Sequence, residues 1–240
     1  PEAEKAKAGT EILQKELPNI AKMATYAKSF DQSNLMIVAP TVRKFANRYS
    51  IDTILSSYDN KNPPKCVCFW HENEENGIFS QWYKTHFKFN GREYVTAEQY
   101  MMSEKALLFE DFDSYKKIME EPDPQKCKAL GKGVKNFNQK KWDESFREII
   151  FMGNFLKAQY DINFLDALLQ TEDALLIEAS PYDDTYGAGL EAKDLVDKNG
   201  FLKTQPKEWQ KEDCTKQAQN NLGFVLMGLR DFYREFLGKK

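Results

Sequence analysis

The sequence predicts an α+β fold that is mostly helical, with a small β-sheet and a helical N-terminal extension. Apolar residues recur at helical spacing along much of the chain, most clearly over 222–236. Short runs rich in β-branched and aromatic residues, bounded by turn residues, indicate only a few strands. No internal repeat is visible, and nothing in the chain reads as the regular strand–helix–strand alternation of a doubly wound sheet.

The composition is that of a globular protein, with 41% hydrophobic and 30% charged residues. The formal net charge of -3 gives no general attraction to nucleic acid or to membranes, so a nucleic-acid partner would need a local patch. No apolar run approaches the roughly 18 residues of a membrane span. The first thirty residues lack the apolar core of a signal peptide, and the four cysteines are scattered. We therefore expect an intracellular protein, cytoplasmic or nuclear, without a membrane partner; no protein partner can be named.

The first 62 residues are expected to form the helical extension. Thr10 is a candidate N-cap for a first helix, and a second helix is expected over 42–55. The Asp-Asn-Lys-Asn-Pro-Pro run at 59–64 is typical of a turn. We therefore divide the chain into an extension over 1–62 and a domain over 63–240.

The predicted elements of the domain begin with strands. A hairpin is expected because Asn90-Gly91 is a favoured two-residue turn. Thr96 and Gln99 have the spacing of a capping box, and Asp123-Pro124 has that of a helix start. The strands are predicted over 67–70, 85–89, 92–95 and 174–178, and the helices over 97–109, from 124, over 139–160, over 163–170 and from 222 to the end.

The predicted helix over 97–109 carries the first candidate site. Glu98, Met102 and Lys105 lie at i, i+4 and i+7, on one helical face. Glu98 and Lys105 are about 10 Å apart along the axis, at 1.5 Å per residue, which is too far for a local ion pair. Two charges that flank an apolar stripe can converge on a third group between them. The alternative is a pair of solvated charges on a surface helix.

The loop after the strand over 174–178 carries the second candidate site. Glu178 closes the strand, and Asp183, Tyr186 and Gly187 follow in a turn-rich segment. Open loops at strand ends carry functional groups more often than core positions do. The alternative is that adjacent aspartates merely form turns. Glycines at 187 and 189 followed by Ala192 match a dinucleotide fingerprint in spacing only, because the strand ends well before the first glycine.

Two further features are candidates for phosphate binding. Lysines between 126 and 141 surround Phe137 and precede Trp142, although a solvated face explains them as well. Asn220 and Asn221 are candidate caps for the last helix, whose N-terminus could hold a pyrophosphate. No nucleophile elbow, P-loop or zinc-protease motif occurs, and two histidines leave little room for a histidine triad or a metal site. The sequence favours carboxylate, lysine and tyrosine chemistry with no metal and no cofactor.

Taken together, these blocks resemble the NADAR superfamily, a resemblance that covers about residues 69–237. No single block is specific, but their order is. The matching segments are 77–83, 97–102 with Lys105-Ala106, 130–132, Trp142, 168–171, 176–181 with Asp183 and Gly187, and 220–223 with Leu226-Met227 and Arg230.

The resemblance implies an N-glycosidase that cleaves a base–ribose bond, and the expected reaction is the removal of ADP-ribose from ADP-ribosylated guanine. The expected partner is then an ADP-ribose-containing nucleotide or an ADP-ribosylated nucleic acid. Lys105 would be the amine nucleophile, Glu98 would position or deprotonate it, and Asp183 would hold the ribose or a water. The substrate-binding set implied by the resemblance comprises Glu178 as support, Tyr186 and Trp82 for stacking, Lys132, Arg230 and Asn220 for phosphates, and Tyr100, Trp142 and Gly187.

Three departures from the family pattern bear on the substrate. Tyr186 stands where the family usually has Trp, and Lys132 stands where it has Arg. Ser103-Glu104 replaces Ala-Gln before the helix lysine. Lys132 can still meet a phosphate, though not as a bidentate donor. Three alternatives stay open: an N-glycosidase of riboflavin-pathway ribosylamino-pyrimidine phosphates, a non-catalytic reader of ADP-ribose or NAD, and a scaffold that has lost its site.

Overall fold

The computed structural model describes residues 32–212 and 214–238, so the helix predicted to start at Thr10 lies outside the described residues. The described chain is a mostly helical α+β fold, as predicted. Its elements are α2 (Gln32–Ala46), α3 (Ile51–Ser57), β1 (Cys66–Phe69), the 3-10 turn η1 (Gly77–Phe79), β2 (Lys84–Phe89), β3 (Arg92–Thr96), α4 (Ala97–Leu108), α5 (Phe112–Glu120), α6 (Pro124–Lys132), α7 (Gln139–Asp143), α8 (Phe146–Tyr160), α9 (Ile162–Gln170), β4 (Leu175–Glu178), α10 (Ala192–Leu195), the 3-10 turn η2 (Pro206–Glu208) and α11 (Asn221–Phe236).

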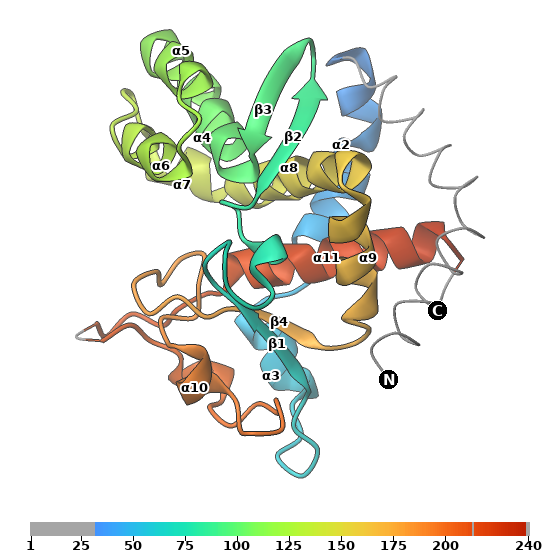
Figure 1. Cartoon of the computed structure of the whole chain (residues 1–240). Helices are drawn as coiled ribbons and strands as arrows, with labels where there is room; N and C mark the ends of the chain where they lie inside the picture. The colour runs from blue at the N-terminus through green and yellow to red at the C-terminus, as the bar shows by residue number, and fades with distance from the viewer. Residues whose placement is uncertain (1–31, 213, 239–240) are drawn as a thin grey trace.

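Two long helices, α8 and α11, pack against each other across the middle of the molecule and separate two lobes (Figure 1). In the upper lobe, the β2–β3 hairpin and α4 to α6 lie over α8. In the lower lobe, β1 and β4 lie under α11, with α3 and α10 near them. Both helices are apolar on more than one face because each packs on two sides. The hydrophobic core therefore runs through both lobes.

The described strands form two separate two-stranded sheets, where the sequence predicted one small sheet. β2 and β3 pair antiparallel through Asn90-Gly91, whose φ angles of 49° and 73° fit the predicted tight turn. β1 and β4 pair in parallel, with Phe69 opposite Glu178. Because the carboxyl ends of parallel strands meet at one edge, the loops after Phe69 and after Glu178 leave the sheet side by side.

The start of α4 is fixed by local hydrogen bonds. Thr96 caps it, since its hydroxyl accepts the Gln99 backbone N–H at 3.1 Å. The Gln99 side chain accepts the N–H of Val95 rather than that of the cap residue, so only half of the predicted capping box forms. Its amide nitrogen donates to the carbonyls of Ile118 and Glu121 at 3.0 Å. Gln99 thereby ties the first turn of α4 to the end of α5.

Two helices predicted as continuous are each divided. The 42–55 helix is interrupted after Ala46, and Ser50 caps α3 in a capping box with Thr53. The 139–160 helix is interrupted between α7 and α8, where the Ser145 hydroxyl donates to the carbonyl of Lys141. Helices α5 and α10 were not predicted. The missed signals were the Ser50 and Asp111 caps of α3 and α5, whereas α8 and α10 begin without a side-chain cap.

The described part of the 1–62 segment packs into the same core as the rest of the chain. Phe45, Ala46 and Ile51 are buried, and Phe45 meets Phe232 of α11 edge-on with ring centroids 5.4 Å apart. A Cβ added at Gly228 would meet the Phe45 carbonyl oxygen, so α2 and α11 approach closely where glycine permits it. The division of the chain between residues 62 and 63 stays a prediction.

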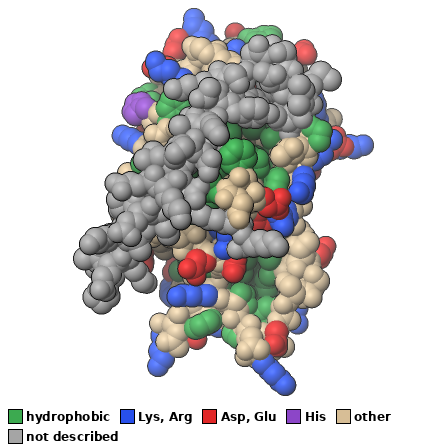
Figure 2. Space-filling view, turned by 90° about the vertical axis from the view of Figure 1, so that its right-hand side faces the viewer, with side chains coloured by type: hydrophobic (Ala, Val, Ile, Leu, Met, Phe, Trp, Pro, Cys, Tyr) green, Lys and Arg blue, Asp and Glu red, His purple; other side chains and the backbone are tan. Residues whose placement is uncertain are grey.

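The surface is mixed in charge. On the face shown in Figure 2, acidic and basic side chains are interspersed, as the small net charge would suggest. Over residues 32–212 and 214–238, no helix combines the length and the apolar character needed to cross a membrane.

Candidate active site

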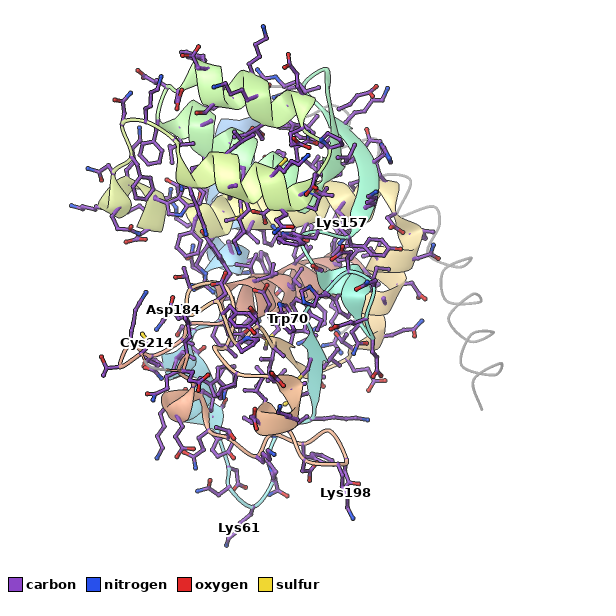
Figure 3. All side chains as sticks on the ribbon, turned by 60° about the vertical axis from the view of Figure 1, so that its left-hand side comes forward. Lys61, Trp70, Lys157, Asp184, Lys198 and Cys214 are labelled. Carbon is purple, nitrogen blue, oxygen red and sulfur yellow. The ribbon has the colours of Figure 1, made fainter. Side chains whose placement is uncertain are left out.

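A cleft between α4, α6 and the loop after β4 contains most of the predicted site residues. It consists of a partly enclosed compartment of about 210 Å³, called the enclosed cavity below, and a somewhat more open groove of about 340 Å³. The two compartments share one wall, formed by Glu98, Lys128, Tyr182, Asp183 and Tyr186. In Figure 3, Trp70, which lines the enclosed cavity, lies between the upper and lower lobes.

Helix α4 brings Glu98, Met102 and Lys105 to the groove together, on the face that their spacing predicts. Glu98 is only 5% exposed, and its backbone N–H donates to the carbonyl of Gln81 at 3.0 Å. The Lys105 ammonium lies over the rings of Phe137 and Trp142, 4.5 and 5.3 Å from their centroids. The Lys105 ammonium therefore makes cation–π contacts with two aromatic rings rather than an ion pair with a neighbouring carboxylate.

Burial changes the protonation of the two charges on α4. It raises the pKa of Glu98 to about 7, an effect that Lys128 opposes. It lowers the pKa of Lys105, an effect that the Glu98 charge opposes. Both groups are thus shifted toward their neutral forms. Shifts in these directions bring the pKa of the carboxyl group and that of the amine closer together, which favours proton exchange between them.

The loop after β4 supplies the opposite wall. Asp183 turns one carboxylate oxygen into the loop, where it accepts the N–H groups of Thr185 at 3.0 Å and Tyr186 at 2.8 Å. Its other oxygen accepts from the Lys128 ammonium at 3.2 Å. The Tyr186 hydroxyl accepts the indole N–H of Trp142 at 3.2 Å. Asp183 therefore both shapes the loop and faces the cleft.

Glu178 is the third carboxyl of the cleft and lines the enclosed cavity. Its backbone N–H donates to the side-chain oxygen of Asn220 at 2.9 Å, while its own Oε2 is buried with no hydrogen-bond partner among the described residues. Burial raises the pKa of Glu178 to about 8; the Asp183 charge adds to this and Lys128 opposes it. Glu178 thus carries a proton at neutral pH and presents it inside the cleft.

Lys128 belongs to the site, although the sequence indicated it only as one lysine of a cationic stretch. It lies at i−4 from Lys132 on α6, so the shared helical face was the available signal. Burial alone would lower the pKa of Lys128, but Asp183 and Glu98 outweigh burial and raise it. Lys128 is therefore the permanently charged lysine of the cleft, and Lys105 is the one shifted toward the neutral amine.

Three other predicted residues lie on the walls of the cleft. Trp82 lines the enclosed cavity, and Trp142 and Lys132 line the groove. Trp142 is buried on the short helix α7, whereas Lys132 ends α6 at the exposed rim.

Four predicted substrate-binding residues lie behind the walls instead. Tyr100 sits in an aromatic cluster, with its ring centroid 5.2 Å from that of Tyr94 and 6.1 Å from that of Phe87. Arg230 is buried in α11 and donates to the Thr171 hydroxyl and the Ala174 carbonyl, which leaves it far better placed to join α11 to β4 than to hold a phosphate. The other two residues, Asn220 and Gly187, hold the loop after β4 in place.

Asn220 stands at the N-cap of α11 but does not cap it with its side chain. It has φ 47°, and its side chain instead joins the Glu178 N–H to the Leu176 carbonyl. The N–H groups of Asn221 and Leu222 donate to the carbonyls of the loop residues 185 and 186. The N–H groups at the start of α11 thus bind carbonyls of the loop. The expectation that the Asn220 side chain caps this helix is wrong.

Gly187 holds the same loop closed. A Cβ at this position would lie 2.9 Å from the Asp183 carbonyl oxygen and 3.1 Å from that of Glu178. Its carbonyl accepts the N–H of Asn220 at 2.9 Å. The glycine is therefore required by the tight approach of the loop to β4, which brings Asp183 and Glu178 together.

The enclosed cavity also has walls that the sequence did not indicate. Trp70 and His71 follow β1, Gln81 follows η1, and Tyr182 lies in the loop after β4. Trp70 and His71 stack with ring centroids 4.0 Å apart. The available signal was that they follow a strand, but only the parallel pairing of β1 with β4 brings that strand end to Glu178.

Comparisons with known proteins agree with this architecture. Residues 68–234 match the family model of the NADAR domain. The N-glycosidase R617 of Acanthamoeba polyphaga mimivirus is 41% identical over 159 residues, which are 64% of this chain and 86% of that protein. Protein irg-1 of Caenorhabditis elegans is 31% identical over 103 residues, which are 42% of this chain and 49% of that protein. The solution structure of YbiA from E. coli superposes with a TM-score of 0.54 at 20% identity, over 72% of this chain and 88% of YbiA, and so shares the fold.

Proposed function

The chain belongs to the NADAR family, and from that premise we propose that it is an N-glycosidase that removes ADP-ribose from ADP-ribosylated guanine. A relative that is 41% identical over most of its length is named an N-glycosidase, which supports the reaction class. The choice of ADP-ribosylguanine as substrate is our own inference from the family resemblance and from the two-compartment cleft. We also propose an intracellular site of action.

The observation that carries the proposal is that helix α4 and the loop after β4 place the Lys105 amine and the carboxyl groups of Glu98, Glu178 and Asp183 around one cleft. Cleaving a ribosyl C–N bond needs an attacking group, a proton for the departing base and stabilisation of positive charge at the anomeric carbon. Lys105 supplies an amine whose pKa burial lowers. Glu178 supplies a proton, and the Asp183 carboxylate beside Lys128 supplies negative charge.

In the proposed reaction, the neutral amine of Lys105 attacks the anomeric carbon of the ribose. The C–N bond to the base breaks, its electron pair moves to the base nitrogen, and Glu178 gives its proton to that nitrogen. Glu98 takes the proton released by the lysine nitrogen through a water molecule in the cleft, because the two side chains lie two helical turns apart. The ribosyl-lysine then opens its ring to a Schiff base, water adds to the carbon, and the C–N bond to lysine breaks. The products are unmodified guanine, ADP-ribose and free Lys105, and the proton held by Glu98 returns to Glu178 by way of solvent.

The test is incubation with an oligonucleotide ADP-ribosylated on guanine, followed by mass spectrometry. We expect the wild type to release ADP-ribose and to leave unmodified guanine, and we expect Lys105→Ala to do neither. Sodium borohydride added during turnover should trap a ribosyl adduct on the peptide that contains Lys105. An active, folded Lys105→Ala protein would end the lysine mechanism. Tight ADP-ribose binding without turnover would favour a non-catalytic reader.

A second candidate substrate is a small ribosylamino-pyrimidine phosphate of the riboflavin type. The observation that favours it is the single lysine at the exposed rim of the groove, Lys132, which suits one terminal phosphate. The same carboxyl groups and Lys105 would act on its ribosyl C–N bond. Release of the pyrimidine from this substrate, with ADP-ribosylated oligonucleotide left intact, would select this reading.

A further inference from the structure

The two compartments of the cleft differ in charge, which orients a bound N-glycoside. Lys132 lines the groove but not the enclosed cavity, whereas Lys128 lines both compartments. A phosphate group attached to the ribose is therefore held on the groove side, because lysine ammonium groups bind phosphate. The sugar then meets the shared wall at Glu98 and Asp183. The base, on the far side of the glycosidic bond, enters the enclosed cavity.

The enclosed cavity suits a planar group. Trp70 and Tyr182 line it from two different loops, with ring centroids 5.8 Å apart and ring planes inclined by 48°. Trp82 lines it as well, and Met101 and Leu222 add apolar surface. Tyr182 is 75% exposed, so its ring stands at the mouth rather than in the core. Aromatic walls of this kind stack on a base of any sequence, so they give affinity without choosing the base.

The choice of base falls to the polar groups of the cavity, and the first of these is Gln81. The Asn154 amide nitrogen donates to the Ile150 carbonyl at 3.0 Å, which fixes the orientation of the Asn154 side chain. The same nitrogen donates to the Gln81 side-chain oxygen at 2.7 Å. The oxygen of Gln81 is therefore already used, and its amide N–H₂, which also contacts the Met101 sulfur, is the polar group offered to the cavity.

The segment that carries Gln81 is held in place by a second group on α8. Lys157 is fully buried, and its ammonium donates to the carbonyls of Ile78 at 2.6 Å and Ser80 at 3.1 Å. Asn154 and Lys157 lie one turn apart on α8, so one helical face fixes both the backbone and the side chain of this wall. Gln81 is thus a rigid donor, and rigidity is what discrimination between similar ligands requires.

The second polar group is Glu178, which lines the same cavity with a buried and unpartnered Oε2 among the described residues. A protonated carboxyl is a hydrogen-bond donor. The cavity therefore offers a base two donors, one from Gln81 and one from Glu178. Guanine carries acceptors at O6 and N7, whereas adenine carries an amino donor in place of O6.

We propose that Gln81, oriented by Asn154, and Glu178 form a base-reading edge that selects a base with a carbonyl oxygen over one with an amino group at that position. The inference rests on the proposed N-glycosidase function for the presence of a base in the cavity. It assigns specificity to residues outside the reacting lysine. A leaving purine of the guanine or hypoxanthine type offers an acceptor to each of the two donors, whereas adenine keeps N7 but places an amino donor where O6 would be.

The test uses free purines that differ only at position 6: hypoxanthine with a carbonyl, purine with hydrogen and adenine with an amino group. Binding to the wild-type protein at pH 6.5 is followed by tryptophan fluorescence, since Trp70 and Trp82 line the cavity. We expect hypoxanthine to bind at least tenfold more tightly than purine or adenine, the loss typical of buried donors left unpaired. Equal or tighter adenine binding, or no binding of any purine at millimolar concentration, would overturn the inference.

Variants at Gln81 identify the residue responsible. Gln81→Leu, whose side chain is one atom shorter and carries no donor, should weaken hypoxanthine binding about tenfold and leave adenine binding unchanged. Asn154→Leu frees the Gln81 amide to turn, so the ratio between hypoxanthine and adenine should fall toward one while both still bind. Thermal unfolding checks that each variant folds. Unchanged discrimination in a folded Gln81→Leu protein would remove Gln81 from this role.

The outcome is separable from that of the proposed function. If hypoxanthine is preferred but no ADP-ribosylated guanine is cleaved, the base-reading edge stands and the substrate is another N-glycoside of a carbonyl-bearing base. If ADP-ribose is released from guanine but the three purines bind equally, the proposed function stands and the base-reading edge is wrong.

Discussion

The two walls of the cleft are built in different ways. The α4 wall, with Glu98 and Lys105, is one helix whose side chains are ordered by local geometry and by the Thr96 cap. The opposite wall, with Glu178 and Asp183, is a strand end and a loop. That loop is held from outside, by the Asn220 side chain and by N–H groups at the start of α11.

Because of this difference, substitutions on the two walls should have different effects. On the α4 wall the reacting groups lie on the helix that positions them, so a substitution of either group removes its function and leaves the fold intact. On the loop wall the scaffold lies about 40 residues away in sequence, so a substitution at Asn220 alters the site without touching the cleft. At the edge of the loop, Asp184 lies beside Cys214 (Figure 3). The loop is held from a distance there too, because the Asp184 carbonyl accepts the N–H of Gln219 at 2.9 Å.

The largest effect is expected on the α4 wall. Lys105→Ala should lower kcat/KM by about 10³-fold or more, because it removes the attacking amine. Lys105→Arg is the matched control, since it keeps a cation over Phe137 and Trp142 but forms no Schiff base. Both variants should be equally inactive in single-turnover assays. Substantial recovery in the arginine variant would show that the cation acts only electrostatically.

The next largest effect is expected on the loop wall, where Glu178 supplies a proton to the departing base. Glu178→Gln should lower kcat by about 10²-fold or more, within the usual range for a general acid. In the wild type, kcat should fall as the pH rises through about 8, because the Glu178 proton is then lost. It should also fall as the pH drops below about 7, where Glu98 is protonated and cannot accept a proton. The alkaline limb should be missing in the variant; its persistence would assign the proton to another group.

The scaffold of the loop wall is tested by Asn220→Gly. Glycine accepts the φ of 47° without strain, so the variant removes only the two hydrogen bonds to the backbone of β4. We expect a loss of about 2 kcal/mol in the free energy of unfolding, from two buried backbone groups left unpaired. Denaturant titration measures it. Asn220→Ala should lose about 1 kcal/mol more, since alanine is strained in the left-handed region; equal losses would mean that strain is absent there.

A smaller effect is expected on the stability of the fold, through the buried carboxyl group of Glu98 on the α4 wall. The pKa of Glu98 is raised to about 7 in the folded state, above the ordinary value of 4.5, so the folded protein binds more protons than the unfolded chain between these values. The stability that Glu98 contributes is therefore lost as the pH rises through 7. Glu98→Gln should raise the melting temperature by a few degrees at pH 8 relative to wild type, and by less at pH 5. An equal gain at both pH values would refute this linkage.

The smallest effect is expected at the rim of the groove. Lys132→Ala should raise KM several-fold and leave kcat unchanged, because the exposed lysine holds a phosphate equally in the ground state and the transition state. Lys135→Ala is the control, since Lys135 is exposed nearby but pairs with Asp113. The KM difference should shrink at high salt. A loss of kcat in Lys132→Ala would place this lysine closer to the reacting bond.

Periodicity and turn chemistry predicted much of the fold. The Asn90-Gly91 turn, the Asp123 cap and the strand that ends at Glu178 are all set within a few residues. Where the sequence was read too simply, a local cap was missed, as at Ser50, which starts α3 inside a predicted continuous helix. Arg230 and Tyr100 were assigned to the substrate from the motif alone, and packing places them behind the walls.

The sequence by itself determined the helical face that joins Glu98 to Lys105 and the order of blocks that indicates the family, because both are properties of spacing along the chain. Only the tertiary structure decided that β1 pairs in parallel with β4, that Lys128 reaches Asp183, and that Asn154 orients Gln81. These contacts join residues that are 55 to 109 positions apart in the sequence. No local pattern encodes them, since each depends on which surfaces are buried against each other when the core forms.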